Sequence, residues 1–269
     1  MYIIMPPKSA KSSYRFKKNV VSIVREELKE VIEEKQALIS YDNTTLNANI
    51  PSGDVQSSFN YMRLLGPIDQ VSYAQTAQDQ GGYNIRIGDE VMLKHLDIKG
   101  FVSMNDLTLA NQQNCRIGVR VMILKQRDEN TDLGFVSNSH ADKLLMNGEL
   151  AIPGPGSFTG RPLNCIQDIN RDLYAVRYDK TFYLAQAYDG DGQATNNQGP
   201  VKPTLKFFKH KMTFGKRGLK LKYTDGNSDT PNNFPYVMVV GYTNLVDNAA
   251  ATNGQVNITM SSVATYTDA

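Results

Sequence analysis

Hydrophobic and polar positions follow three different patterns along the 269-residue chain. Residues 1–18 show neither helical nor strand periodicity and hold prolines, serines and lysines with almost nothing to bury, which predicts a flexible basic arm. Across residues 19–36, hydrophobic residues recur at helical spacing while charged residues fill the opposite face, which predicts an amphipathic helix. From residue 37 to residue 269, short segments of strand period alternate with polar, turn-rich stretches.

Nine segments carry the alternation or the hydrophobic run expected of a strand. They are Leu38–Tyr41, Asn60–Leu65, Val91–Val102, Arg116–Leu124, Leu173–Leu184, Leu205–Phe214, Leu219–Tyr223, Tyr236–Tyr242 and Val256–Ser261. The hydrophobic phase shifts by one residue between Leu93 and Leu96, which predicts a β-bulge in that strand. Tyr236–Tyr242 is hydrophobic on both faces, as expected of a central strand, and Leu173–Leu184 is long enough for one bent strand or two.

The connections between these segments are polar, and three of them are long: Lys125–Asp168, Ala187–Pro203 and Thr224–Pro235. The first is too long for a structureless loop in a compact domain, so we expect it to hold a short helix or minor strands. No helical pattern recurs between the strands, which argues against a βαβ fold. The sequence therefore predicts an all-β fold: a single antiparallel jelly-roll β-sandwich of eight to nine strands over residues 37–269, with long loops and the short N-terminal helix before it.

Side chains that could carry catalysis or hold a metal ion are scattered along the chain. None of the three histidines, His95, His140 and His210, has a second His, Cys or carboxylate at metal-ligand spacing. The sequence contains neither a P-loop nor a nucleophile elbow, and its two cysteines, Cys115 and Cys165, are too few for a disulfide scaffold. We therefore expect no enzymatic activity, no cofactor and no metal site. No hydrophobic run is long enough to cross a bilayer, so we expect no membrane partner.

Positive charge is concentrated in two segments. The arm has five basic residues and residues 201–224 have eight, with no acid in either, whereas the whole chain is only +2, so the remainder is acidic. This distribution indicates one side that faces a polyanion. The candidate nucleic-acid-binding residues are Lys8, Lys11, Arg15, Lys17, Lys18, Lys206, Lys209, Lys211, Lys216, Arg217, Lys220 and Lys222. Two simpler interpretations stay open: a solubilising tail for the arm, and protection of a sheet edge for the Lys-rich strands.

One stretch, Arg86-Ile87-Gly88-Asp89 through Gly100, resembles a segment in capsid proteins of circular Rep-encoding single-stranded DNA (CRESS-DNA) viruses, of the circovirus-like single jelly-roll type. In that group an R-x-G-[DN] turn introduces a strand of the form L-x-x-L-x-I-x-G, and this chain has Leu93, Leu96, Ile98 and Gly100 at those positions. The pattern of strands over residues 37–269 is also similar in outline to that group.

The resemblance implies a coat protein that assembles with itself into a small icosahedral shell of about 60 copies around a single-stranded DNA genome. It implies location in the virion, and in the host nucleus or cytoplasm during assembly, with a host receptor or glycan as a further partner. The arm of this chain lacks the arginine block of many relatives. The lysines of residues 202–222 are therefore expected to contribute to genome binding.

The alternative function is a jelly-roll carbohydrate- or receptor-binding module that forms a small oligomer. We expect such a protein to be secreted, whereas this sequence shows no signal-peptide pattern and no tryptophan for stacking on sugars. A small discrete oligomer with saturable glycan binding would favour this alternative. A β-sandwich hydrolase is the weakest hypothesis, because the sequence offers no acid–base pair.

Overall fold

The computed structural model describes residues 34–50, 60–70, 83–105, 116–132, 135, 140–148, 154–185, 205–246 and 250–268. The strands are β1 (Lys35–Thr45), β2 (Tyr61–Arg63), β3 (Asp69–Gln70), β4 (Ile85–Arg86), β5 (Glu90–Met104), β6 (Arg116–Gln126), β7 (Leu145–Asn147), β8 (Gly154–Gly156), β9 (Tyr174–Ala185), β10 (Leu205–Thr213), β11 (Leu219–Lys222), β12 (Tyr236–Asn244) and β13 (Val256–Asp268). Two 3-10 helices, η2 (His140–Lys143) and η3 (Pro162–Cys165), lie between β6 and β9.

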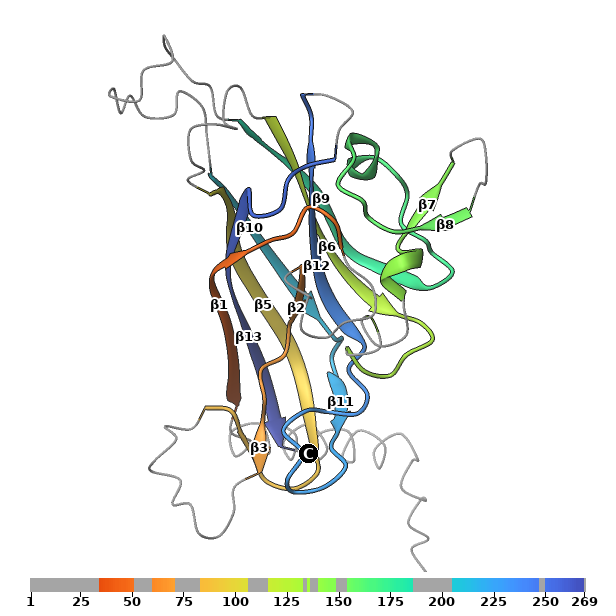
Figure 1. Ribbon diagram of the computed structural model, residues 1–269. Coiled ribbons are helices and arrows are strands. Elements are labelled where there is room, and N and C mark those ends of the chain that lie inside the picture. The colour runs from red at the N-terminus through yellow and green to blue at the C-terminus, as the bar shows by residue number, and fades with distance from the viewer. Residues whose placement is uncertain are drawn as a thin grey trace, which may run out of the picture.

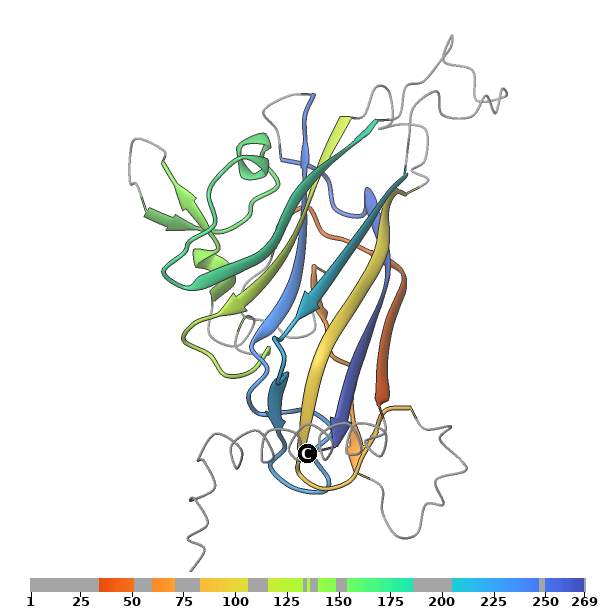
Figure 2. The ribbon, with the colours of Figure 1, turned by 180° about the vertical axis from the view of Figure 1, so that it is seen from behind.

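The strands form two main antiparallel sheets, which Figures 1 and 2 show as two layers. Sheet A has the order β1-β13-β5-β10, and β11 pairs with β5 beyond the end of β10. Sheet B has the order β2-β12-β6-β9. Two short pairs complete the set, β3 with β4 in parallel and β7 with β8 antiparallel. The predicted all-β class, with antiparallel sheets, is confirmed.

The largest hydrophobic cluster contains residues from both sheets. From sheet A it includes Val91, Leu93, Leu96, Ile98 and Val102 of β5, and from sheet B it includes Ile117, Val119, Val121 and Ile123 of β6. These residues alternate along their strands with residues of the opposite face, so each sheet turns one face to a shared core. The hydrophobic face predicted for Arg116–Leu124 is therefore the buried one.

The other face of sheet B is also covered. Met122 and Leu124 of β6 belong to a second cluster with Phe135, Phe158 and Tyr174, which come from the connection after β6 and the start of β9. Alternation along Arg116–Leu124 identifies one hydrophobic face, yet Met122 on the other face is also fully buried. The reason is that described residues of the connection between β6 and β9, such as Phe135 and Phe158, pack on this side of the sheet as hydrophobic partners from elsewhere in the chain.

All nine predicted strands are present, and the local irregularities also match. In the pairing of β13 with β5, Tyr266 is opposite Leu93 and Thr265 is opposite His95, so Lys94 is the extra residue of a bulge. The segment Leu173–Leu184 forms one strand, β9, with a register shift around Arg177. The connection Lys125–Asp168 holds η2, η3, β7 and β8, which confirms the expected short elements.

The helix predicted over residues 19–36 is contradicted at its last two positions. Lys35 and Gln36 belong to β1 and are opposite Tyr266 and Thr265 of β13, so the prediction was wrong for these two residues. Lys35 is buried and forms an ion pair with Asp268, a partner from the far end of the chain that the local pattern does not reveal. The arm (1–18) and residues 19–33 lie outside the described residues.

The side chain of Arg86 ties together the end of sheet A where β5 begins. Its guanidinium is 0% exposed and lies 4.2 Å from the ring centroid of Tyr223. Because a buried cation is costly unless its donors are satisfied, the surrounding segments must offer acceptors at fixed positions. These acceptors are the carbonyl oxygens of Ile68, Gly88, Asp225 and Ser228 and the carboxylate of Asp89.

At two positions of the same stretch, 88 and 100, the structure explains why the residue is glycine. Gly88 has a backbone φ of +89°, which residues other than glycine rarely adopt, so it permits the turn into β5. At Gly100, an added Cβ would come within 2.6 Å of the carbonyl oxygen of Thr259 and 2.7 Å of the Phe208 ring. Gly100 therefore allows the buried ring of Phe208 to pack directly on the backbone of β5.

Replacing Arg86 tests the role of this buried guanidinium. We expect Arg86→Lys to lower the free energy of unfolding by about 3–5 kcal/mol, because one ammonium group leaves several buried carbonyl oxygens without a donor. The measurement is urea unfolding followed by circular dichroism. The control is Asp89→Asn, whose side chain is 56% exposed and should cost less than about 1 kcal/mol. Equal, small losses for both variants would contradict the assignment.

Candidate nucleic-acid interface

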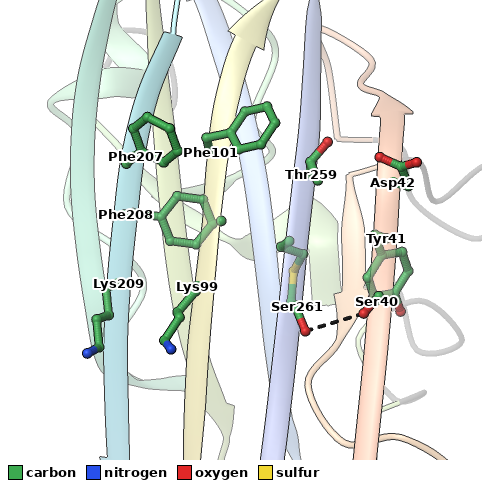
Figure 3. A pocket seen from close by; sticks show the side chains of 12 residues that line it. Ser40, Tyr41, Asp42, Lys99, Phe101, Phe207, Phe208, Lys209, Thr259 and Ser261 are labelled. Atoms are coloured by element: carbon green, nitrogen blue, oxygen red, sulfur yellow. Dashed lines mark hydrogen bonds between the residues drawn. The ribbon is translucent and has the colours of Figure 1, made fainter.

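The face of sheet A that points away from the core carries a row of polar and basic side chains. Strand register places Ser40 of β1 opposite Ser261 of β13, Ser261 opposite Lys99 of β5, and Lys99 opposite Lys209 of β10. The hydroxyls of Ser40 and Ser261 are 3.3 Å apart, and the two lysines project side by side from neighbouring strands (Figure 3). Both lysines are exposed, and neither has a carboxylate partner within the described part of the chain.

The next row along the same face is aromatic. Phe207 of β10 is opposite Phe101 of β5, which is opposite Thr259 of β13. The two rings meet edge to face with their centroids 5.5 Å apart, and Phe207 is 73% exposed. Figure 3 shows this pair directly above the two lysines. We call Lys99, Phe101, Phe207 and Lys209 the basic–aromatic face.

A shallow hollow of about 710 Å³ lies over these two rows. Its lining runs across four strands, from Lys209 and Phe207 on β10 to Ser40 and Asp42 on β1. The lysines and the carboxylate of Asp42 therefore stand on opposite sides of the hollow (Figure 3). A ligand that spans the hollow meets positive charge and aromatic rings on one side, and hydroxyl groups and one carboxylate on the other.

Two of the predicted lysines are paired with acids on the same face. Lys211 lies 3.7 Å from a carboxylate oxygen of Asp97, which also contacts His95 at 3.3 Å. Lys220 lies 2.6 Å from a carboxylate oxygen of Glu90. Because these charges are already partly compensated, Lys211 and Lys220 contribute less net attraction for a polyanion than Lys99 and Lys209 do.

Three further basic residues lie at the same end of sheet A as β11. Lys216 and Arg217 are exposed in the turn between β10 and β11, and Lys222 is exposed at the end of β11. The amide side chain of Asn233 accepts from the backbone N–H of Lys222 and donates to the carbonyl of Lys220. Because Asn233 covers this edge of β11, the lysines of β11 are not needed to protect it, which favours the polyanion interpretation over edge protection.

Lys206 does not belong to this surface. Strand alternation places it on the same side of β10 as Phe208 and Met212, whose side chains are in the core. His210 shares that inner side, with its ring centroid 5.0 Å from that of Tyr178. Partial burial lowers the pKa of His210, so its imidazole adds little positive charge at neutral pH.

The five basic residues predicted in the arm, Lys8, Lys11, Arg15, Lys17 and Lys18, lie outside the described residues. Within the described part, the structure adds three residues that sequence reasoning did not select: Lys99, Phe101 and Phe207. Their signal was available, because Lys99 and Phe101 have the same strand parity on β5, and Phe207 and Lys209 have it on β10. What the sequence could not supply was the register that places the two pairs side by side.

Other chemistry is sparse in the described residues. They contain no group of three or more His, Cys, Asp or Glu side chains that could hold a metal ion. Cys165 is a free, buried thiol whose sulfur lies 3.1 Å from the hydroxyl of Thr243, and burial raises its pKa. Arg120 is buried and holds Asp179 through two hydrogen bonds, which is a structural ion pair. No helix among these residues is long and hydrophobic enough to span a membrane.

The sequence matches no protein-family model, and no curated protein is significantly similar to it.

Proposed function

We propose that this chain is a viral coat protein that assembles with itself into a small icosahedral shell and packages single-stranded nucleic acid. The observation that carries the proposal is the basic–aromatic face. On this open sheet face, two lysines without a carboxylate partner among the described residues adjoin an aromatic pair in which the Phe207 ring is exposed. Lysines give sequence-independent affinity for phosphates, and exposed aromatic rings stack on unpaired bases.

The order of strands supports a jelly-roll sandwich as the fold of this coat protein. The eight strands that make up the two four-strand orders of sheets A and B are, along the chain, β1, β2, β5, β6, β9, β10, β12 and β13. The first pairs with the last, the second with the second-last, and so on inward, giving the pairs β1–β13, β2–β12, β5–β10 and β6–β9. A long antiparallel ribbon wrapped so that its pairs alternate between two sheets is the jelly-roll arrangement, which viral capsids and some lectins use.

The position of the arm in the chain is consistent with this proposal. The arm precedes β1, and β1 is an edge strand of sheet A, the sheet that carries the basic–aromatic face. In the chain, the arm therefore comes before the sheet that carries the basic–aromatic face. In a closed shell, a common orientation of the arm and this face toward the enclosed volume would compensate the charge of the genome.

Self-association is supported by hydrophobic side chains exposed on the connection that covers sheet B. Met146, Leu163 and Ile166 are exposed, and Ile166 is 75% exposed. Their segments are adjacent, because the backbone N–H of Met146 donates to the carbonyl of Asp168. Exposed hydrophobic residues on neighbouring segments are typical of protein–protein contacts.

The proposal as a whole is tested by the purified full-length chain. We expect electron microscopy to show closed particles, and the ratio of absorbance at 260 to 280 nm to show co-purified nucleic acid. A monomer or a small discrete oligomer without nucleic acid, and with saturable glycan binding, would instead support the carbohydrate- or receptor-binding alternative.

The contribution of individual lysines is tested by the salt dependence of binding to a single-stranded oligonucleotide. We expect the double variant Lys99→Gln/Lys209→Gln to reduce the slope of log affinity against log salt, because each phosphate contact on a single strand contributes about 0.7. The reduction is about 0.7 if the two lysines share one phosphate and about 1.4 if each binds its own. Lys211→Gln/Lys220→Gln should reduce it less, since both residues are already paired with acids. Lys143→Gln, an exposed lysine on η2, serves as the control, and an equal change in this variant would show that only net charge matters.

Assembly through the connection that covers sheet B is tested at Ile166. We expect Ile166→Asp to leave the subunit folded but to prevent or strongly reduce particle formation, because a carboxylate would have to be buried in the contact. Ile166→Leu, which keeps a hydrophobic side chain, should assemble normally. Size-exclusion chromatography with light scattering measures both, and wild-type particle yield for Ile166→Asp would place the contact elsewhere.

A further inference from the structure

We propose that the hollow on sheet A is a nucleotide-binding site: the aromatic pair stacks on one unpaired base while Lys99 and Lys209 bind the phosphate next to it. This inference rests on the proposed function and adds to it a specific site. It also adds a property, which is selectivity for single-stranded over double-stranded nucleic acid.

The first support is the exposure of Phe207. Large hydrophobic side chains are ordinarily buried, whereas the Phe207 ring is 73% exposed and meets the ring of Phe101 edge to face. Its neighbour Phe208 points to the opposite side, where it contacts Phe182 of sheet B at 6.3 Å between centroids. Strand alternation therefore fixes Phe207 outward, with one ring face available for stacking.

The second support is the spacing of charge and ring. Along β5 and β10, each lysine is two residues from the aromatic residue of the same strand, which corresponds to about 6.8 Å. This separation is comparable with that between a phosphate and the base of the same nucleotide. Lys99 and Lys209 are direct cross-strand neighbours whose side chains project side by side (Figure 3), so both ammonium groups can reach one phosphate.

The third support is the polar side of the hollow, which gives the ligand a direction. Asp42 repels a phosphate, so the phosphate is directed toward the lysines. The carboxylate of Asp42 and the hydroxyls of Ser40 and Ser261 instead suit the amino group of a base or the hydroxyls of a sugar. A nucleotide has all three components, whereas a sulfated glycan or a lipid headgroup has no planar ring to occupy the aromatic side.

The test separates stacking from charge by using three probes of equal length. They are an oligothymidylate, an abasic phosphodiester oligomer with the same charge, and a DNA duplex. We expect the wild-type chain to bind the oligothymidylate more tightly than the other two. Phe207→Leu should weaken oligothymidylate binding by roughly 5- to 150-fold, the effect of losing one stacked base, and leave abasic binding and the salt slope unchanged.

Two matched variants complete the experiment. Tyr183→Leu removes a ring of similar exposure, 60%, from β9 of sheet B and should not change binding. The chain contains no tryptophan, so Phe207→Trp gives a single fluorescent reporter at the site. We expect its emission to be quenched by the oligothymidylate but not by the abasic oligomer.

The outcomes distinguish this inference from the proposed function. If particles with nucleic acid form but Phe207→Leu binds oligothymidylate as well as wild type does, the stacking site is wrong and the coat function stands. Equal wild-type affinity for the oligothymidylate and the abasic oligomer would likewise overturn the site, because it would show charge attraction alone. If the wild-type chain neither forms particles nor binds any of the three probes, the proposed function itself fails.

Discussion

The buried guanidinium of Arg86 is the interaction on which the arrangement of sheet A depends. Removing an unpaired cation from water costs several kcal/mol, so its donors have to be satisfied together. They are satisfied when the segment before β3, the Gly88 turn and the connection after β11 all meet at one point. That meeting point fixes where β5 begins, and β5 is the strand to which β13, β10 and β11 all pair.

The exposed surface of the sheet follows from this start and from the bulge at Lys94. With one extra residue after Leu93, the parity of β5 places Lys99 and Phe101 outward and Ile98 inward. Antiparallel register then brings Lys209 and Phe207 beside them. The corresponding face of sheet B is covered by the connection after β6. The two sheets therefore differ. Sheet A presents an open face with charged and aromatic side chains, whereas the corresponding face of sheet B is covered by hydrophobic residues of the connection.

The success of sequence reasoning depended on how local each feature is. Strand positions and the bulge were predictable, because the alternation of hydrophobic and polar residues, and its shift in phase, can be seen in consecutive residues such as Leu93 to Leu96. The ends of elements were less predictable. Lys35 belongs to β1 and pairs with Asp268, a residue at the other end of the chain that the local pattern does not reveal. The burial of Met122 depends on Phe135 and Phe158, which the pattern of β6 cannot reveal. For the site, lysines clustered in sequence were found, but Lys99 and Phe101 required the register between strands.

The bulge also constrains how this chain can change during evolution. Because side chains alternate, removing Lys94 would exchange the inward and outward residues of β5 on one side of the deletion. Leu96 and Ile98 would then face solvent, while Lys99 would face the core. Loops between strands tolerate changes of length, whereas this strand does not. We therefore expect distant relatives to share the number of residues between the Arg86 turn and Gly100 even where overall identity is low.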